Sequence, residues 1–110
     1  MNNNDERIFS LGQVLNITTG KLFTNMEDIY DTMSYIVGDN LSTIGLLENR
    51  ELVSNYILSK YPNLKGVGVG VTFNGAEEVN EYLERQEEIF GNDYPLSPMK
   101  SIGINESRTR

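Results

Sequence analysis

The sequence predicts one domain of the α+β class, in which three N-terminal helices precede a strand–helix–strand unit with a small sheet. Three features carry this prediction. Apolar residues recur at intervals of three and four between residues 11 and 60, as in amphipathic helices. Valine and phenylalanine then alternate with glycine and threonine over residues 67–73, as in a strand. A further helical pattern and a short segment with two prolines follow.

The chain has 110 residues, which is enough for one domain of ordinary size. At this length a single hydrophobic core is sufficient without disulfide staples. We expect residues 1–8 to be a disordered N-terminus, residues 9–102 to form the α+β domain, and residues 103–110 to be a disordered tail.

The first two helices are predicted from their end signals. Ser10 is a good N-cap for a helix over Leu11–Thr19, and Gly20 suits the left-handed position that ends it. Thr24 and Glu27 have the spacing of a capping box for a second helix. An apolar stripe runs along this second helix as far as Gly38: Met26, Ile29, Tyr30, Met33, Ile36 and Val37.

The remaining elements follow in order. Residues 38–45 read as a turn, and a third helix is expected from Asn49 to Lys60, just before Pro62. The strand over residues 67–73 has glycine on one face, which indicates close packing there. A fourth helix is expected from an Asn74 cap to Gly91, and an edge strand over residues 94–99. If the two strands are parallel, the connection between them is right-handed.

Two missing residue types exclude whole classes of chemistry. The chain has no cysteine and no histidine, which excludes disulfides, thiolate or histidine nucleophile systems and a conventional zinc site. We therefore predict that the protein is not an enzyme and has no cofactor or metal. An enzyme that uses only carboxylates, tyrosine or lysine stays open as an alternative.

Charge and hydropathy bound the location and the partners. The net charge is −7, so general nucleic-acid binding, which needs a basic footprint, is not expected. The polar start MNNNDER has no apolar segment of a signal peptide, and no apolar run approaches the roughly 18 residues of a membrane helix. We expect a cytoplasmic protein with no membrane contact.

Residues Thr18, Thr19, Gly20 and Lys21 are the first candidate binding site. Two hydroxyls, a glycine amide and an ammonium group can converge on an anion. The spacing is not that of a P-loop, because Gly12 lies too far before Gly20 and leucine follows the lysine. The alternative is an ordinary helix end with a glycine cap and a lysine that complements the helix dipole.

Other polar clusters have weaker signatures. The glycines of residues 66–71 lack the dinucleotide-binding spacing, and Asp39 and Asn40 suit a turn better than a cation site. The glutamates of the fourth helix, between residues 77 and 88, read as a solvated face or as an acidic surface that docks on a basic partner.

Several segments resemble a family of small phage and prophage proteins of unknown function. The resemblance covers residues 9–99 and is most specific in the first part. It is carried by Phe9-Ser10-Leu11-Gly12, Val14-Leu15, Ile17-Thr18-Thr19-Gly20-Lys21-Leu22, Asp28-Ile29-Tyr30, Gly38-Asp39-Asn40-Leu41 and Thr43, and later by Leu83-Glu84-Arg85-Gln86 and Tyr94-Pro95-Leu96-Ser97-Pro98. Where the family has Thr-His-Gln-Leu-Pro-Arg, this chain has Thr43-Ile44-Gly45-Leu46-Leu47-Glu48, and Arg50 is a candidate substitute for the lost arginine.

The resemblance implies a phage-encoded protein that acts in the host cytoplasm. Small phage proteins of this kind often antagonise host defence, which suggests a non-enzymatic protein that sequesters a nucleotide-derived immune signal, as a homo-oligomer. The alternative is an inhibitor that binds a host protein through an acidic surface. For the first function, the expected residues at the anionic ligand are Thr18, Thr19, Gly20, Lys21, Asp39, Asn40, Thr43 and Arg50.

Overall fold

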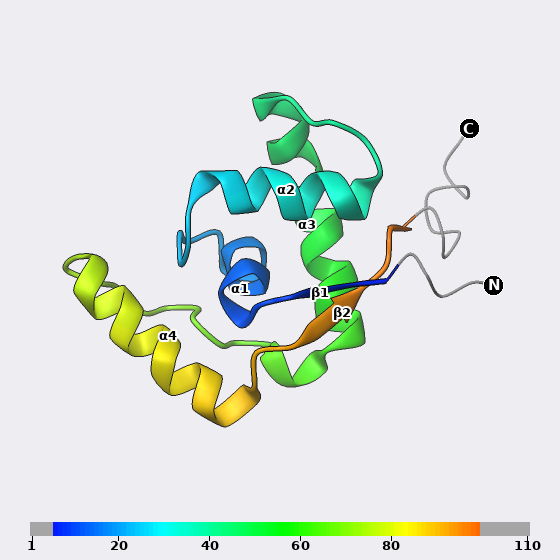
Figure 1. Cartoon of the computed structure of the whole chain (residues 1–110). Helices are drawn as coiled ribbons and strands as arrows, with labels where there is room; N and C mark the ends of the chain where they lie inside the picture. The colour runs from blue at the N-terminus through cyan, green and yellow to red at the C-terminus, as the bar shows by residue number, and fades with distance from the viewer. Residues whose placement is uncertain (1–5, 100–110) are drawn as a thin grey trace.

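The computed structural model describes residues 6–99, which form four α-helices and a two-stranded sheet (Figure 1). In chain order the elements are β1 (Arg7–Phe9), α1 (Leu11–Thr19), α2 (Met26–Val37), α3 (Thr43–Lys60), the 3₁₀ turn η2 (Pro62–Leu64), α4 (Ala76–Phe90) and β2 (Tyr94–Leu96). The broad α+β class is confirmed. The predicted order is wrong, because the strands lie at the two ends of the described chain rather than around α4.

Helix α1 has the predicted bounds because both of its ends are fixed locally. The Ser10 hydroxyl accepts a hydrogen bond from the Gln13 amide at 3.2 Å, and the Gln13 side chain accepts one from the Ser10 amide at 2.9 Å. This reciprocal capping box satisfies two amides that a helix start leaves free. Gly20 ends the helix with a φ of 76°, a left-handed conformation that glycine adopts without a steric penalty.

Helices α2 and α3 begin at other N-caps than those predicted from the sequence. Asn25, rather than Thr24, caps α2, since its side-chain oxygen accepts from the Asp28 amide at 2.8 Å. Helix α3 begins well before the predicted Asn49, because the Ser42 hydroxyl accepts from the Gly45 amide at 3.1 Å. Part of the predicted turn is therefore the first turn of a longer helix.

The predicted strand over residues 67–73 is wrong. Gly66, Gly68 and Gly70 have φ angles of 86°, 80° and 83°, whereas a strand requires negative φ. The segment forms successive turns, in which the Val67 amide donates to the Leu64 carbonyl and the Val69 amide to the Gly66 carbonyl. The glycines supply left-handed turn positions, and within residues 6–99 the predicted strand–helix–strand unit around α4 is absent.

Helix α4 begins at Ala76, after Gly75, and has no side-chain N-cap. The predicted cap, Asn74, instead donates its backbone amide to the Glu78 carboxylate at 2.8 Å. The end at Phe90, followed by Gly91, agrees with the prediction.

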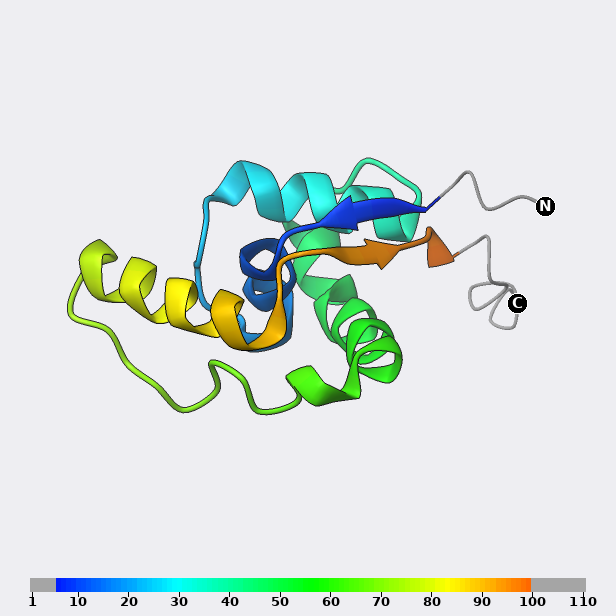
Figure 2. The ribbon, with the colours of Figure 1, turned by 60° about the horizontal axis from the view of Figure 1, so that its bottom comes forward.

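The sheet joins the two ends of the described chain. Strands β1 and β2 are antiparallel and pair Arg7 with Leu96, Ile8 with Pro95, and Phe9 with Tyr94 (Figure 2). Arg7 and Ile8 were expected in a disordered segment, so that boundary is corrected. The predicted tail over residues 103–110 lies outside the described residues.

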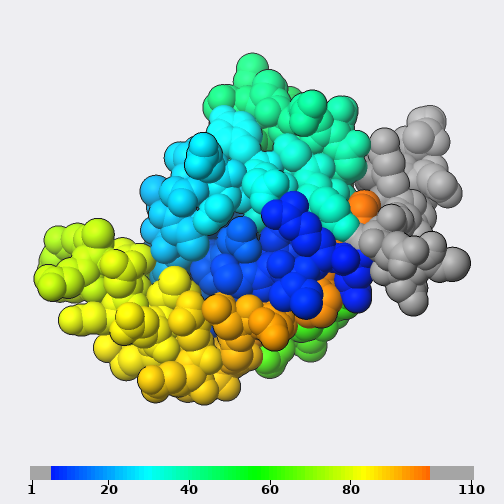
Figure 3. Space-filling model, in the orientation of Figure 1, coloured from blue at the N-terminus to red at the C-terminus, as the bar shows by residue number. Residues whose placement is uncertain are grey.

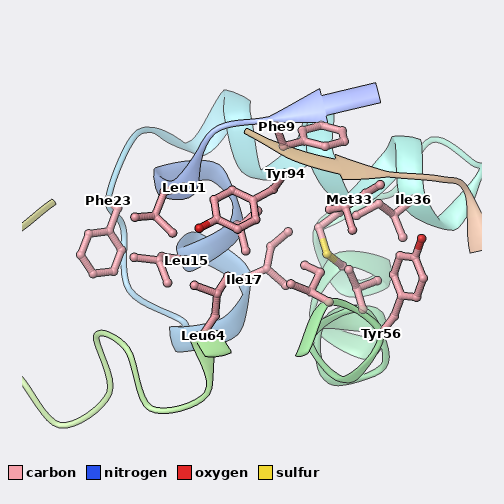
Figure 4. Packing of buried hydrophobic residues seen from close by; sticks show 14 of the residues in the cluster. Phe9, Leu11, Leu15, Ile17, Phe23, Met33, Ile36, Tyr56, Leu64 and Tyr94 are labelled. Carbon is pink, nitrogen blue, oxygen red and sulfur yellow. The ribbon is translucent and has the colours of Figure 1, made fainter. Parts of the chain in front are cut away.

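The hydrophobic core lies between α1, α2, α3 and the sheet (Figure 4). Phe9 and Tyr94 from the strands and Leu15 from α1 are at most 3% exposed, and α3 adds Ile57 from the other side. Each fully buried large side chain stabilises the fold by about 1.5–3 kcal/mol relative to exposure. Helix α4 contributes no buried residue, and it forms a lobe at one edge of the molecule (Figure 3).

Candidate functional site

A small cavity lies where the C-terminal end of α1 meets α2 and α3. Its volume is about 130 Å³. It is lined by Asn16, Ile17 and Gly20 of the first helix and its end, Ile29 and Met33 of α2, and Leu46, Leu47 and Arg50 of α3. Five of these side chains are aliphatic or thioether groups, and Arg50 is the one charged group that the described residues contribute to the lining. We call this feature the Gly20–Arg50 cavity.

Two structural constraints favour glycine at position 20. Its φ of 76° ends α1 in the left-handed conformation. A Cβ atom at this position would also lie 2.9 Å from Nη2 and 3.1 Å from Cζ of Arg50. The Arg50 guanidinium therefore lies directly against the Gly20 backbone, in space that any other residue would occupy.

Arg50 is a cation without a partner in the described structure. Its Nε is buried and has no hydrogen-bond acceptor. Within residues 6–99 the ion pairs are Arg7 with Asp31 and Lys60 with Glu6, and neither involves Arg50. A buried donor without an acceptor costs about 1–3 kcal/mol. The cavity thus presents a half-buried positive charge with unused donor capacity.

Asn16 lines the cavity but serves the fold. Its side-chain oxygen accepts from the Phe23 amide at 2.6 Å and from the Thr24 amide at 3.2 Å, and its amide donates to the Thr24 hydroxyl at 2.7 Å. These three bonds hold the segment between α1 and α2 in place. Asn16 was not among the predicted site residues, although a lone asparagine within an apolar helix face is a visible signal in the sequence.

The predicted Thr18–Lys21 cluster is only partly assembled. The Thr19 hydroxyl donates to the Leu15 carbonyl at 2.6 Å and accepts from the Lys21 amide at 2.9 Å, so it closes its own helix end. The Thr18 hydroxyl is buried without a partner. Of these four residues, only Gly20 lines the cavity, which supports the helix-end alternative for Thr19 and Lys21.

The second predicted cluster lies apart from the Gly20–Arg50 cavity. Asp39 and Asn40 border a more open hollow of about 440 Å³, lined also by Arg7, Asp31, Ser34, Tyr35 and Gly38. Arg7 is paired with Asp31 there, and the Asp39 carboxylate accepts from the Asn40 amide at 2.9 Å. With its one arginine neutralised and a second carboxylate nearby, this hollow is unsuited to an anion.

Thr43 is also engaged elsewhere. Its hydroxyl shares a hydrogen bond of 2.9 Å with the Tyr30 hydroxyl, which ties the start of α3 to α2. The structure thus unites Gly20 and Arg50 and leaves the remaining predicted site residues outside their cavity.

A third hollow, of about 310 Å³, lies between α4 and the chain before it. It is lined by Val71, Thr72, Phe73, Glu78, Glu81, Tyr82 and Arg85. The Phe73 and Tyr82 rings are 5.4 Å apart, and the Tyr82 hydroxyl accepts from the Gly68 amide at 2.9 Å. These contacts fasten the turn segment to α4.

Residues 6–99 contain no group of three or more acidic, histidine or cysteine residues placed to hold a metal ion. No helix in this part of the chain has both the length and the apolar character to cross a bilayer.

A family described as a domain of unknown function, DUF7736, matches residues 9–67, which is more than half of the chain. The matched region includes every residue that lines the Gly20–Arg50 cavity and ends before α4. Neither the search of curated proteins nor that of solved structures found a match.

Proposed function

The chain belongs to the DUF7736 family, and we propose that it is a non-enzymatic binding protein that holds a small anionic ligand in the Gly20–Arg50 cavity. The observation that carries the proposal is the unpaired Arg50 guanidinium at an otherwise apolar cavity. The absence of histidine and cysteine from the sequence supports binding rather than catalysis.

Arg50 is suited to recognise an anion. A guanidinium presents its donors as a rigid fork that pairs with two oxygens at once, and charge-assisted hydrogen bonds are about twice as strong as neutral ones. Because the group is half-buried, solvent and salt screen it less than a surface arginine. A bound anion would also give Nε the acceptor it lacks.

The biological setting that we propose is sequestration of a nucleotide-derived immune signal by a phage protein in the host cytoplasm. The resemblance of residues 9–99 to small phage proteins supports this setting. We further propose a homo-oligomer, because Ile44 and Leu47 are 68% and 67% exposed near the start of α3 and Leu47 lines the cavity. A second subunit packed on these side chains would cover a bound ligand.

Native mass spectrometry of the full chain tests this proposal. The protein is measured alone and with a panel of cyclic nucleotides, ADP-ribose derivatives and short carboxylic acids. We expect a retained small anion, lost in Arg50→Ala and kept in Arg85→Ala, which removes an arginine outside the cavity. Retention by Arg50→Ala, or no retained anion across the panel, would contradict the proposal.

A second function is favoured by α4. The helix carries six glutamates and one arginine, while the whole chain has a net charge of −7, and none of its residues is buried. We propose as the alternative that this acidic surface docks on a basic surface of a host protein. Such association is steered by charge and weakens as salt rises.

Charge reversal separates the two functions. One double variant carries Glu81→Lys and Glu84→Lys on α4. The control double variant carries Glu48→Lys and Glu51→Lys, at exposed positions of α3, and changes the net charge by the same amount. If α4 is the docking surface, only the first pair abolishes retention of the partner, and high salt reproduces the loss. Equal effects of both pairs would show a dependence on net charge alone.

A further inference from the structure

We infer that the Gly20–Arg50 cavity selects a carboxylate on a short branched aliphatic body, such as a 4-methylpentanoate group. This inference rests on the proposed binding of a small anion in this cavity, and it replaces the nucleotide-derived signal with a carboxylate as the class of ligand. It follows from three properties of the cavity, namely the character of its walls, the number of its cations and its size.

The walls favour an aliphatic body. Ile17, Ile29, Met33, Leu46 and Leu47 make up most of the lining, and none is aromatic. A nucleobase gains most from stacking on aromatic rings, and these walls offer none. Branched alkyl groups instead gain free energy with each methylene they bury, and they need no polar partner.

The polar side of the cavity matches two oxygens. Among residues 6–99, Arg50 is the one charged residue in the lining. The oxygen and amide of Asn16 are already bonded to Phe23 and Thr24. One guanidinium can satisfy both oxygens of a carboxylate. A phosphate group would bring further oxygens toward aliphatic walls, where buried polar atoms without hydrogen-bond partners are strongly disfavoured.

The volume of the cavity also favours a small carboxylate. At about 130 Å³ the cavity is well below the roughly 300–1,000 Å³ of sites that enclose drug-sized ligands. A carboxylate with a few carbon atoms fits this space. A nucleotide could place only a part of itself in the cavity.

Leu47 offers a variant that tests the body of the ligand separately from its charge. Its side chain lines the cavity and is 67% exposed, so its truncation should leave the core intact. Leu47→Ala should therefore weaken the aliphatic contact without removing the ion pair to Arg50.

The test is isothermal titration calorimetry of the full chain with 4-methylpentanoate, its uncharged amide, acetate and inorganic phosphate. We expect 4-methylpentanoate to bind about tenfold or more tightly than the amide, because a charge-assisted bond is replaced by a neutral one. Acetate and phosphate should bind more weakly still. N-acetylleucine is titrated as a fifth ligand. Tighter binding of N-acetylleucine than of 4-methylpentanoate identifies a peptide C-terminus rather than a free acid as the source of the carboxylate.

The variants complete the design. Arg50→Ala should lose 4-methylpentanoate binding, Leu47→Ala should weaken it but leave acetate unchanged, and Arg85→Ala should match the parent, with circular dichroism as the check of folding. Phosphate binding at least as tight as that of 4-methylpentanoate, lost in Arg50→Ala, would overturn the ligand class and leave the proposed function standing. Equal binding of acid and amide would also overturn the class. Binding that Arg50→Ala does not change would overturn both.

Discussion

The two ends of the domain differ in how their helices are used. Helices α1, α2 and α3 all place residues in the core, whereas α4 has the helical pattern of an amphipathic helix but no buried residue. Its apolar side rests on α1, where Gly12 allows close approach: a Cβ at Gly12 would lie 3.1 Å from Leu83. The comparison teaches that an apolar stripe shows which face of a helix packs against the domain. How far the side chains of that face are buried depends on how many other elements surround it.

The largest predicted contrast is between a core residue and its counterpart on α4. Ile57 of α3 is 0% exposed, while Leu83 is half-buried against α1. We expect Ile57→Ala to lower the free energy of unfolding by about 2–5 kcal/mol and Leu83→Ala by about 1 kcal/mol. Urea denaturation measures both. Similar losses would mean that α4 belongs to the same cooperative core as α3.

Asn16 should be the next most costly position. Asn16→Ala removes three hydrogen bonds and leaves two amides of the α1–α2 connection without an acceptor, so we expect a loss of about 1–3 kcal/mol. Asn49→Ala is the matched control, because that side chain makes one bond, to the Gly45 carbonyl at 2.8 Å. An Asn16→Ala protein as stable as the control would refute this structural role.

The turn segment before α4 offers a pair of glycines that share a conformation but differ in surroundings. Gly68 and Gly70 have φ of 80° and 83°, but a Cβ at Gly68 would lie 2.9 Å from Thr19, whereas nothing lies within 4 Å at Gly70. Alanine costs about 1–2 kcal/mol at either position through the left-handed backbone. We expect Gly68→Ala to lower the melting temperature further than Gly70→Ala. A larger drop in melting temperature for Gly70→Ala than for Gly68→Ala would contradict the close approach of this segment to α1.

The smallest predicted effect is a loss of folding stability at alkaline pH. Burial raises the pKa of Tyr61 and of Tyr94 above the ordinary 10.0, and their hydroxyls donate to the carbonyls of Pro95 and Phe90 at 2.7 and 2.6 Å. The folded protein therefore keeps these protons to a higher pH than the unfolded chain does. The stability they give is complete below about pH 10 and is lost as pH rises through the raised pKa values.

Denaturation at a series of pH values measures this effect in the parent and in the double variant Tyr61→Phe, Tyr94→Phe. The parent should lose stability more steeply above pH 10. The same slope in both proteins would show that other groups, such as lysines, control alkaline unfolding.

What the sequence predicted correctly was fixed locally. The ends of α1 follow from the Ser10 cap and from Gly20, which act within a few residues. The segment over residues 67–73 was mispredicted because alternation of valine and glycine does not reveal the sign of φ, and Gly66, Gly68 and Gly70 all adopt positive φ in local turns. Strand β1 was missed because its pairing partner, β2, lies at the other end of the described chain.

The candidate site was also predicted only in part from the sequence. Gly20 and Arg50 were both candidates, but their contact across two helices was not predictable from spacing. The aliphatic lining reads as ordinary core in the sequence, since Ile29 and Met33 belong to the apolar stripe of α2. Thr19 and Lys21 were placed at the ligand from their chemistry, whereas the helix end already uses the Thr19 hydroxyl.

The most direct test of the account is a two-dimensional amide NMR titration of the full chain with 4-methylpentanoate. The account predicts saturable shifts at Ile17, Gly20 and Leu47, around the cavity, with the amides of α4 unchanged, and loss of these shifts in Arg50→Ala. Shifts confined to α4, or shifts that persist in Arg50→Ala, would contradict the claim that the α1–α2–α3 region holds the binding site.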